Sequence, residues 1–262
     1  MLAVRIHHLD VARYLAILLR LSLLVFLVPP FSNSRIPAII KACFALAFTT
    51  MLFPLLSNQV PPISFQAGSL LSTVVSEVIF AVLMALSVSL ILGAFEFAGE
   101  LISYQAGLTM AQVVDPQGGF QMPIVSNLIQ LVALLLLLSL NGHHIFLKLV
   151  VESFQTFPVG EFMLNVTTID RLILLSGQLF IIGIKLAAPV VMVLFLIEIG
   201  LGVISKFIPN LNVLMTSFPI AVIVGLLFVG LALPYWGEAM AHSFSQLFGF
   251  LQDIVQPIVP VR

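Results

Sequence analysis

Residues 70–104 read LLSTVVSEVIFAVLMALSVSLILGAFEFAGELISY, and this stretch decides the fold class of the chain. It contains no proline over about 35 residues, so it can form one helix of roughly 50 Å at a rise of 1.5 Å per residue. The hydrocarbon core of a bilayer is only about 30 Å thick. The helix therefore tilts strongly or projects beyond the bilayer, and we expect an all-α protein built of long helices.

The remainder of the chain is also apolar. Of its 262 residues, 61% are hydrophobic and only 8% are charged. A soluble domain averages about 25% charged residues, so this chain could not cover a water-facing surface and is predicted to be an integral membrane protein. Its net charge of -1 gives no support for nucleic acid binding. Cys43 is the only cysteine, which excludes an intrachain disulfide and a thiolate metal cluster.

Six windows are long and apolar enough to be candidate bilayer spans, namely 11–28, 36–56, 70–95, 124–151, 172–197 and 211–234. The fourth contains Asn141-Gly142-His143-His144, where we expect a turn or kink. Pro189 interrupts the fifth window and Pro219 lies early in the sixth. Basic residues flank both ends of the first window, so the positive-inside rule assigns no orientation.

Several charged residues fall within or beside these windows: Glu77, Glu96, Glu100, Lys185 and Glu198. Charges at membrane depth usually face a protein interior or a water-filled cavity. Glu96 and Glu100 could equally lie at a helix end and extend to the interface. No Lys or Arg occurs between Lys41 and Lys148. The carboxylates in that region must therefore be compensated by a distant part of the chain, by a partner, or by a hydrated lumen.

One face of the 70–104 helix carries small residues at four-residue spacing: Ala81, Ala85, Ser89 and Gly93. Small side chains on one face allow another helix to approach closely within a membrane. This pattern predicts a helix-packing face, without indicating a particular activity.

A polar, nearly uncharged segment lies at residues 107–122, between two very apolar runs. Its glycines give backbone freedom, and Asp115-Pro116 disfavours continuation of a helix. Methionine fills irregular gaps, and irregular backbone at membrane depth is tolerated where it lines a wet cavity. The segment therefore suits a deformable obstruction in a water-accessible path, although an external loop on one membrane face explains it equally well. The candidate obstructing residues are Gly107, Met110, Gln112, Asp115, Pro116, Phe120, Gln121 and Met122.

The sequence contains no recognisable catalytic or metal-binding motif. The adjacent pair His143-His144 would point about 100° apart on a helix, which makes a poor two-ligand site. Neither HExxH nor GxSxG occurs, and Gly118-Gly119 lacks the context of a phosphate-binding loop. We therefore expect no enzymatic activity, no catalytic or metal-ligating residue and no cofactor.

Three stretches carry a resemblance to a known family: FEFAGELISYQAGLTMAQVVDPQ (95–117), SLNGHHIFLKLVVESFQTFPVG (139–160) and KFIPNLNVLMTSFPIAVIVGLL (206–227). With them the chain resembles the FliR family of flagellar biosynthetic proteins and its virulence type III secretion counterparts. The resemblance covers most of the chain in the expected order, while the first 35 residues match only in character.

The resemblance implies one FliR-like domain over residues 1–262, built of bent helical hairpins, in which six simple spans would be an overcount. It implies a non-enzymatic subunit of the flagellar type III export gate, which forms part of the channel for unfolded flagellar substrates. The implied partners are FliP, FliQ and FlhB, together with membrane lipid. The implied location is the bacterial inner (cytoplasmic) membrane, within the flagellar basal body. In this family a loop obstructs the closed pore, and that role maps onto residues 107–122. The alternative is a small-solute or ion-coupled transporter that uses Glu77 or Glu198.

Overall fold

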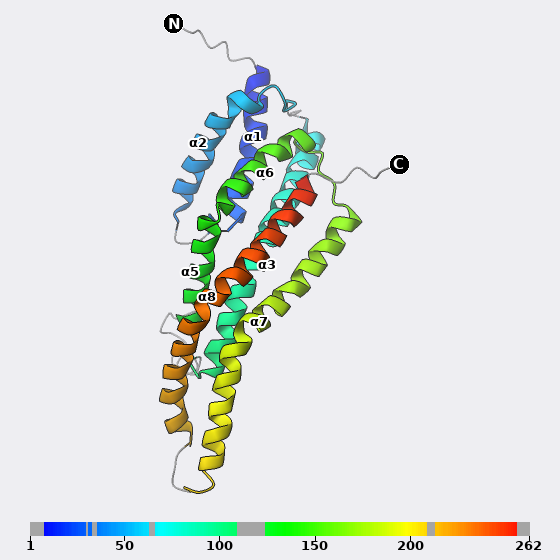
Figure 1. Ribbon diagram of the computed structural model, residues 1–262. Helices are drawn as coiled ribbons and strands as arrows, with labels where there is room; N and C mark the ends of the chain where they lie inside the picture. Colours follow the sequence, from blue (N-terminus) through cyan, green and yellow to red (C-terminus); the bar gives the residue numbers. More distant parts are fainter. Residues whose placement is uncertain are drawn as a thin grey trace. The chain divides into compact units, whose positions relative to one another are not determined.

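The computed structural model describes residues 8–29, 31–32, 36–62, 66–108, 124–208 and 213–255, and within them all regular structure is helical (Figure 1). The helices are α1 (His8–Leu27), α2 (Ala38–Leu56), α3 (Ala67–Gln105), α5 (Ile124–Ser139), α6 (Gly142–Thr156), α7 (Val166–Ile204) and α8 (Val213–Val255). The predicted all-α fold is confirmed.

Helix α3 is one continuous helix of 39 residues, as the proline-free run predicts. It ends at a left-handed glycine, because Gly107 has φ +74°. The Gly107 N–H donates to the Tyr104 carbonyl and the Leu108 N–H donates to the Ser103 carbonyl, each at 3.0 Å. This pair of hydrogen bonds is the Schellman arrangement that satisfies the last carbonyls of a helix. Gly107 therefore has an identifiable structural role as the cap of α3.

Helices α7 and α8 both continue through prolines, so Pro189 interrupts the fifth apolar window without ending the helix. Pro189 lies inside α7, and Pro219 and Pro234 lie inside α8. A proline inside a helix removes one backbone hydrogen bond and strains the carbonyls of the preceding turn. One carbonyl of that turn, from Leu186, accepts a hydrogen bond at 3.1 Å from the buried Trp236 indole of α8. This contact joins α7 to α8 beside the proline.

The predicted turn at residues 141–144 is confirmed. Helix α5 ends at Ser139, α6 begins at Gly142, and Asn141 between them has φ +56°. Asparagine is one of the few residues other than glycine that adopt this left-handed conformation readily. The local sequence therefore explains why the fourth apolar window forms two helices.

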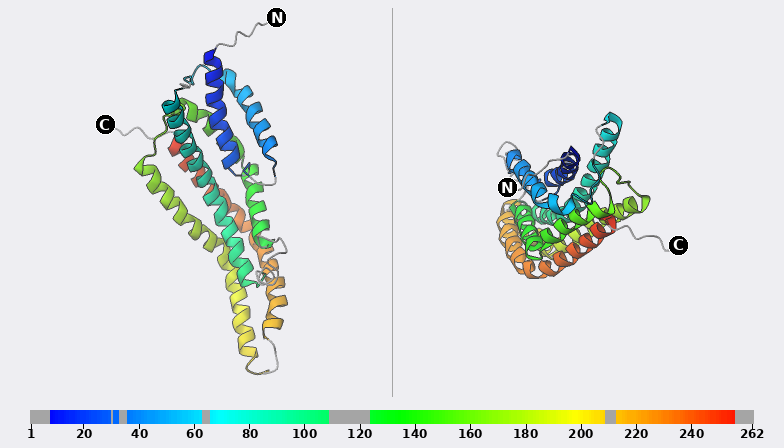
Figure 2. Two further views of the ribbon diagram at one scale, coloured as in Figure 1. Left: turned by 180° about the vertical axis from the view of Figure 1, so that it is seen from behind. Right: turned by 90° about the horizontal axis from the view of Figure 1, so that it is seen from above.

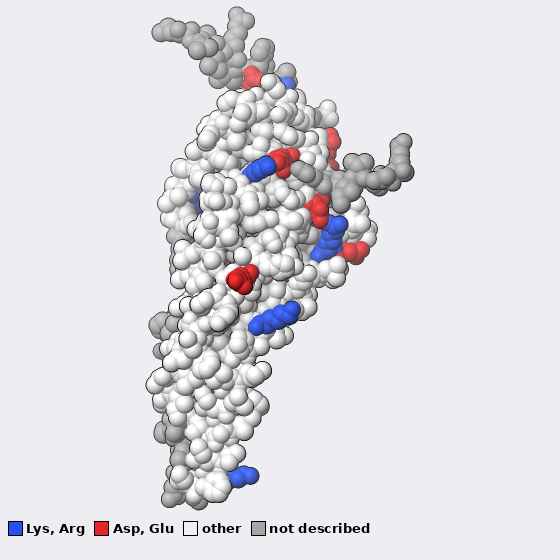
Figure 3. All heavy atoms as spheres, in the orientation of Figure 1, with Lys and Arg blue, Asp and Glu red and all other residues white. Residues whose placement is uncertain are grey.

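By length and composition, four helical segments could cross a membrane: α2, α3, α7 and residues 217–255 of α8. A fifth crossing would result if α5 and α6 form one broken span. Helix α1, which carries Asp10, Arg13 and Arg20, is not among these candidates. Figure 3 shows that uncharged atoms cover most of one face of the protein.

The chain forms two compact units, and α3, α7 and α8 contribute residues to both. The first unit comprises Met1–Ser89, Gly142–Ile173 and Gln246–Arg262, and the second comprises Leu90–Asn141 and Leu174–Ser245. In the first unit α1 packs against α2, and the two helices lie side by side in every view (Figures 1 and 2). In the core of the second unit, the rings of Phe95 and Phe244 meet edge to face at 5.5 Å.

Candidate functional site

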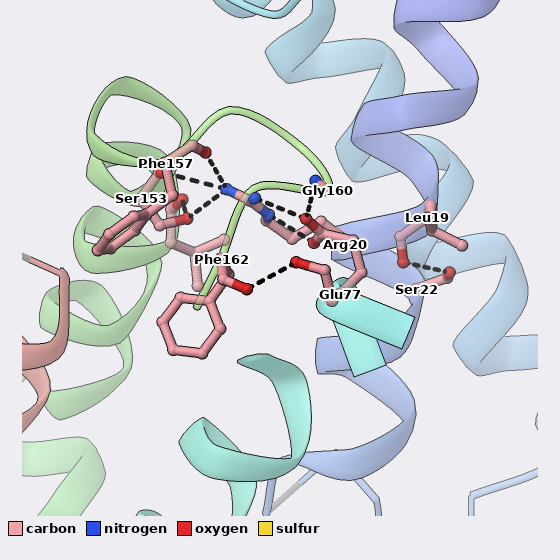
Figure 4. A network of polar contacts seen from close by, with 10 residues as sticks. Leu19, Arg20, Ser22, Glu77, Ser153, Phe157, Gly160 and Phe162 are labelled. Carbon is pink, nitrogen blue, oxygen red and sulfur yellow. Dashed lines mark hydrogen bonds and ion pairs between the residues drawn. The ribbon is translucent and has the colours of Figure 1, made fainter. Parts of the chain in front are cut away.

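The most elaborate polar site in the described residues is a buried ion pair in the first unit, between Arg20 of α1 and Glu77 of α3 (Figure 4). Arg20 Nε donates to Glu77 Oε2 and Arg20 Nη2 donates to Oε1, both at 2.7 Å. The two side chains are only 1% and 0% exposed. Two parallel charge-assisted hydrogen bonds of this kind fix both the distance between the two side chains and their relative orientation.

The same two side chains also hold the chain segment that follows α6. Arg20 Nη1 donates to the carbonyls of Ser153 and Phe157, each at 3.1 Å, and lies 3.2 Å from Ser153 Oγ. The Ser153 carbonyl, in the last turn of α6, also accepts the Phe157 N–H at 2.9 Å, so the guanidinium adds a second donor at the C-terminal end of this helix. Glu77 Oε1 accepts the Gly160 N–H at 2.9 Å. The pair thus connects α1, α3 and the segment 157–165 between α6 and α7.

Aromatic rings enclose this network. The Arg20 guanidinium carbon lies 4.6 Å from the ring centroid of Phe154 and 5.1 Å from that of Phe80. Cation–π attraction is strongest where the cation is removed from water, as it is here. The Phe162 ring packs edge to face on Phe80, and its carbonyl accepts the Ser76 hydroxyl at 3.0 Å. These contacts close the network to solvent.

A close backbone approach completes the site at Gly160. This residue has φ +90°, and a Cβ placed on it would lie 2.8 Å from Thr73 Oγ1 and 3.1 Å from Thr73 Cα. Only glycine combines that backbone conformation with such a short distance to α3. The segment between α6 and α7 is therefore held against α3 both by the hydrogen bond to the Glu77 carboxylate and by the close packing of Gly160 on Thr73.

The compensating charge for Glu77 comes from a distant part of this chain, the first of the three alternatives that the sequence left open. Sequence reasoning singled out Glu77 but not Arg20. The available signal was that Arg20 interrupts the apolar run of the first window, where a positive charge needs a buried partner. The saturated pair can hold the helices together but leaves no exposed carboxylate to take up a solute or an ion.

The other predicted membrane charges lie in the second unit and are more accessible. Glu198 is exposed and accepts a hydrogen bond from Gln105 Nε2 at 2.9 Å. Glu96 is half-buried, with its Oε2 3.5 Å from Gln130 Nε2. Glu100 and Lys185 are exposed on the chain. Only Glu77 of the five is fully enclosed by its own chain.

The predicted helix-packing face divides into two parts. Ala81 and Ala85 are buried, whereas Ser89 is exposed. Gly93 is half-buried, and a Cβ placed on it would lie 3.5 Å from the Leu179 side chain. The packing role of this face in an assembly stays a prediction.

Two helical glycines outside the Ala81–Gly93 pattern lie very close to a neighbouring helix. A Cβ on Gly99 of α3 would lie 2.9 Å from the Ser126 backbone nitrogen of α5. A Cβ on Gly183 of α7 would lie 2.6 Å from the Phe97 ring and 3.0 Å from the Ala94 carbonyl. Gly99 has small residues at four-residue spacing after it, Ser103 and Gly107, and this pattern could have indicated it.

Of the candidate obstructing residues, only Gly107 is described by the structure. A Cβ placed on it would lie 3.2 Å from the Phe218 ring of α8. The others, Met110, Gln112, Asp115, Pro116, Phe120, Gln121 and Met122, lie outside the described residues. Among the residues that the structure describes, no group of three or more His, Cys, Asp or Glu could hold a metal ion.

Comparison with known proteins gives the chain a family. Residues 11–247 match the model of the bacterial export proteins, family 1. The chain is 30% identical over 242 residues to the flagellar biosynthetic protein FliR of Escherichia coli strain K12, covering 92% of each chain. It is 32% identical over 236 residues to FliR of Pectobacterium carotovorum subsp. carotovorum, covering 90% of each.

A virulence protein is similar as well. The Yop proteins translocation protein T of Yersinia pestis is 28% identical over 213 residues, which cover 80% of this chain and 79% of that protein. Because the family model matches nearly the whole sequence, we conclude that the chain belongs to family 1 of the bacterial export proteins.

Proposed function

We propose that this chain is a non-enzymatic subunit of the flagellar type III export gate, in the bacterial inner membrane at the flagellar basal body. Its partners are FliP, FliQ and FlhB, and its cargo is unfolded flagellar protein. The observation that carries the proposal is the match over residues 11–247 to an export family, with FliR relatives aligned over about nine-tenths of both chains. The flagellar assignment follows the names of the two FliR relatives reported above.

The helices support an assembled membrane role. Helices α2, α3, α7 and α8 are long and apolar enough to cross a membrane. Many large apolar side chains on α7 and α8 are exposed on the single chain, such as Met192, Ile223 and Leu231. Lipid or other subunits must cover such surfaces, because a soluble monomer rarely exposes apolar patches of this extent.

The structure argues against the alternative of an ion-coupled transporter. Both Glu77 oxygens are occupied by Arg20, and the side chain is fully buried, so it is poorly placed to bind and release an ion. Glu198 remains accessible, but its carboxylate already accepts the Gln105 amide. Nothing in the described residues favours solute binding at either carboxylate.

Co-purification tests the subunit assignment. A tagged form of the chain, extracted from membranes in mild detergent, should remain with FliP and FliQ through size-exclusion chromatography. The contrary result is a complex of FliP and FliQ that forms in full without this chain, while the chain itself elutes alone.

Within this role, residues 107–122 obstruct the central path, with Met110, Phe120 and Met122 as flexible apolar stoppers. Gln112 and Gln121 bind neighbouring backbone. A net contribution of about 0.5–1.5 kcal/mol per hydrogen bond suits a closure that must yield to a passing chain. The support is the position of the segment directly after the Gly107 cap, where α3 ends.

A permeability measurement tests the obstruction. Replacing Met110 and Met122 with Ala, or deleting Gly118–Gln121, should leave assembly intact and raise ion conductance through the complex. Met51→Ala and Met192→Ala are matched controls, since both methionines are exposed and lie in helices. Altered complexes that assemble normally and stay as tight as the controls would favour an external loop instead.

A further inference from the structure

The first unit contains a cavity of about 560 Å³ that the export role does not use. Its walls come from the segment 157–165, the first turns of α7 and the last turns of α8. Phe162 and Phe250 form apolar walls, and Thr168, Arg171 and Asp253 supply polar groups. Cavities that bind small ligands typically measure about 300–1,000 Å³ and combine apolar walls with a few polar groups.

The cavity carries one positive and one negative charge side by side. Arg171 Nη1 donates to Asp253 Oδ2, and the two side chains are 46% and 41% exposed. A guanidinium has five N–H donors and a carboxylate has several acceptor sites, so a single contact leaves both groups able to bind further partners. The site therefore suits a ligand that carries both an anion and a cation.

The apolar sequence around the cavity indicates what kind of ligand this is. The apolar window 172–197 begins directly after Arg171, and α7 is long and apolar enough to cross a membrane. Val166, Ile169 and Ile173 recur at helical spacing on α7 and are exposed. Charged residues at the end of an apolar helix typically lie at the level of lipid headgroups. The cavity thus has a headgroup-sized polar site next to an exposed apolar stripe.

We propose that this cavity binds the headgroup of a zwitterionic phospholipid with a primary ammonium group, as in phosphatidylethanolamine. The phosphate binds Arg171 and the Thr168 hydroxyl, and the ammonium donates to Asp253. One acyl chain lies along Met163 and the exposed stripe of α7. A quaternary ammonium cannot donate a hydrogen bond to Asp253, and a headgroup without a cation leaves that carboxylate facing the phosphate.

The buried network prepares this site without taking part in it. Phe162 is held by the Ser76 hydroxyl and by its edge-to-face contacts with Phe80 and Phe157. Gly160 is held by Glu77. The wall formed by the segment 157–165 is therefore fixed by contacts with Ser76, Glu77 and Phe80 of α3, which do not line the cavity. The inference goes beyond the proposed export role and is tested on the purified chain, so either can fail alone.

The test is lipid binding to the full chain in detergent, measured by native mass spectrometry. Phosphatidylethanolamine, phosphatidylcholine and phosphatidylglycerol of identical acyl composition are compared. We expect preference for phosphatidylethanolamine. Arg171→Gln should weaken its binding by about tenfold or more, as expected for loss of a hydrogen bond to a charged group. Asp253→Asn should reduce the affinity for phosphatidylethanolamine to that for phosphatidylcholine.

A second ion pair in the same unit, between exposed Lys148 and half-buried Glu152, provides the control. Lys148 and Glu152 lie 3.7 Å apart on α6, away from the cavity lining, so Lys148→Gln with Glu152→Gln should leave the lipid preference unchanged. If Arg171→Gln does not fold, Arg171→Lys is measured in its place. This variant retains the charge and should retain part of the affinity. Equal binding of all three lipids, or equal losses in the cavity and control variants, would overturn the proposal. A lipid-free complex in which another export subunit fills the cavity would also overturn the proposal.

Discussion

Removing Arg20 tests whether the buried network holds the first unit together. In Arg20→Ala, Glu77 would lose both of its 2.7 Å hydrogen bonds while remaining enclosed by α1, α3 and the segment 157–165. The Phe157 carbonyl would lose the donor that Arg20 supplies, whereas the Ser153 carbonyl would keep the Phe157 N–H at 2.9 Å. We expect a large loss of stability from one substitution that leaves the apolar helix surfaces intact.

The size of this stability loss follows from the burial of both side chains. Removing one partner of a buried ion pair typically costs about 3–5 kcal/mol, because the other charge is left uncompensated. Replacing both partners with apolar residues, as in Arg20→Met with Glu77→Leu, removes that penalty. The double variant should still be less stable than the parent. It leaves the Phe157 carbonyl and the Gly160 N–H without these partners, at about 1–3 kcal/mol for each group left unsatisfied.

Thermal or denaturant unfolding of the purified chain in detergent measures these differences. The prediction is that the double variant loses clearly less stability than the sum of the Arg20→Ala and Glu77→Ala losses. The control is the pair of exposed Lys148 and half-buried Glu152 on α6, one helical turn apart, with an expected contribution of about 0.3–0.5 kcal/mol. Additive losses, or single losses no larger than those of the control pair, would refute the reasoning.

Three further substitutions test the close contacts. Gly99→Leu should destabilise the second unit by at least about 1–3 kcal/mol through overpacking against Ser126, whereas Gly200→Leu, with open space around it, should have little effect on unfolding. Gly160→Ala should destabilise the first unit by about 1–3 kcal/mol, because of its positive φ and the nearby Thr73; normal stability would contradict that explanation. Ser89→Leu and Gly93→Leu should reduce recovery of the export complex on native gels, and unchanged recovery for both would exclude a packing face there.

Much of the fold can be predicted from the local sequence. The absence of proline between residues 70 and 104 predicts the length of α3, and Asn141-Gly142 predicts the break between α5 and α6. Pro189 interrupts the fifth apolar window in the sequence, and α7 nevertheless continues through it. Its missing N–H removes only one helical hydrogen bond, while packing on both sides of it holds the helix.

The site was harder to predict because its contacts join distant parts of the chain. Arg20 and Glu77 are 57 positions apart, and Gly160 is 83 positions from Glu77. Hydrophobic periodicity identifies which residues lie on one face of a helix, but not which helix covers that face. The charge argument showed that Glu77 needed a partner, and only the three-dimensional arrangement identified Arg20. The same limit explains why Gly183 was missed.

Secretion by cells of the source organism tests the central claim most directly. The chain is deleted, restored, or restored with Gly118–Gln121 removed, and flagellar proteins exported into the medium are quantified alongside membrane conductance. The account predicts that deletion abolishes flagellar export, that the intact chain restores it, and that the shortened chain assembles but leaks ions. Undiminished export without the chain, or loss of uptake of a small solute in place of export, would contradict it.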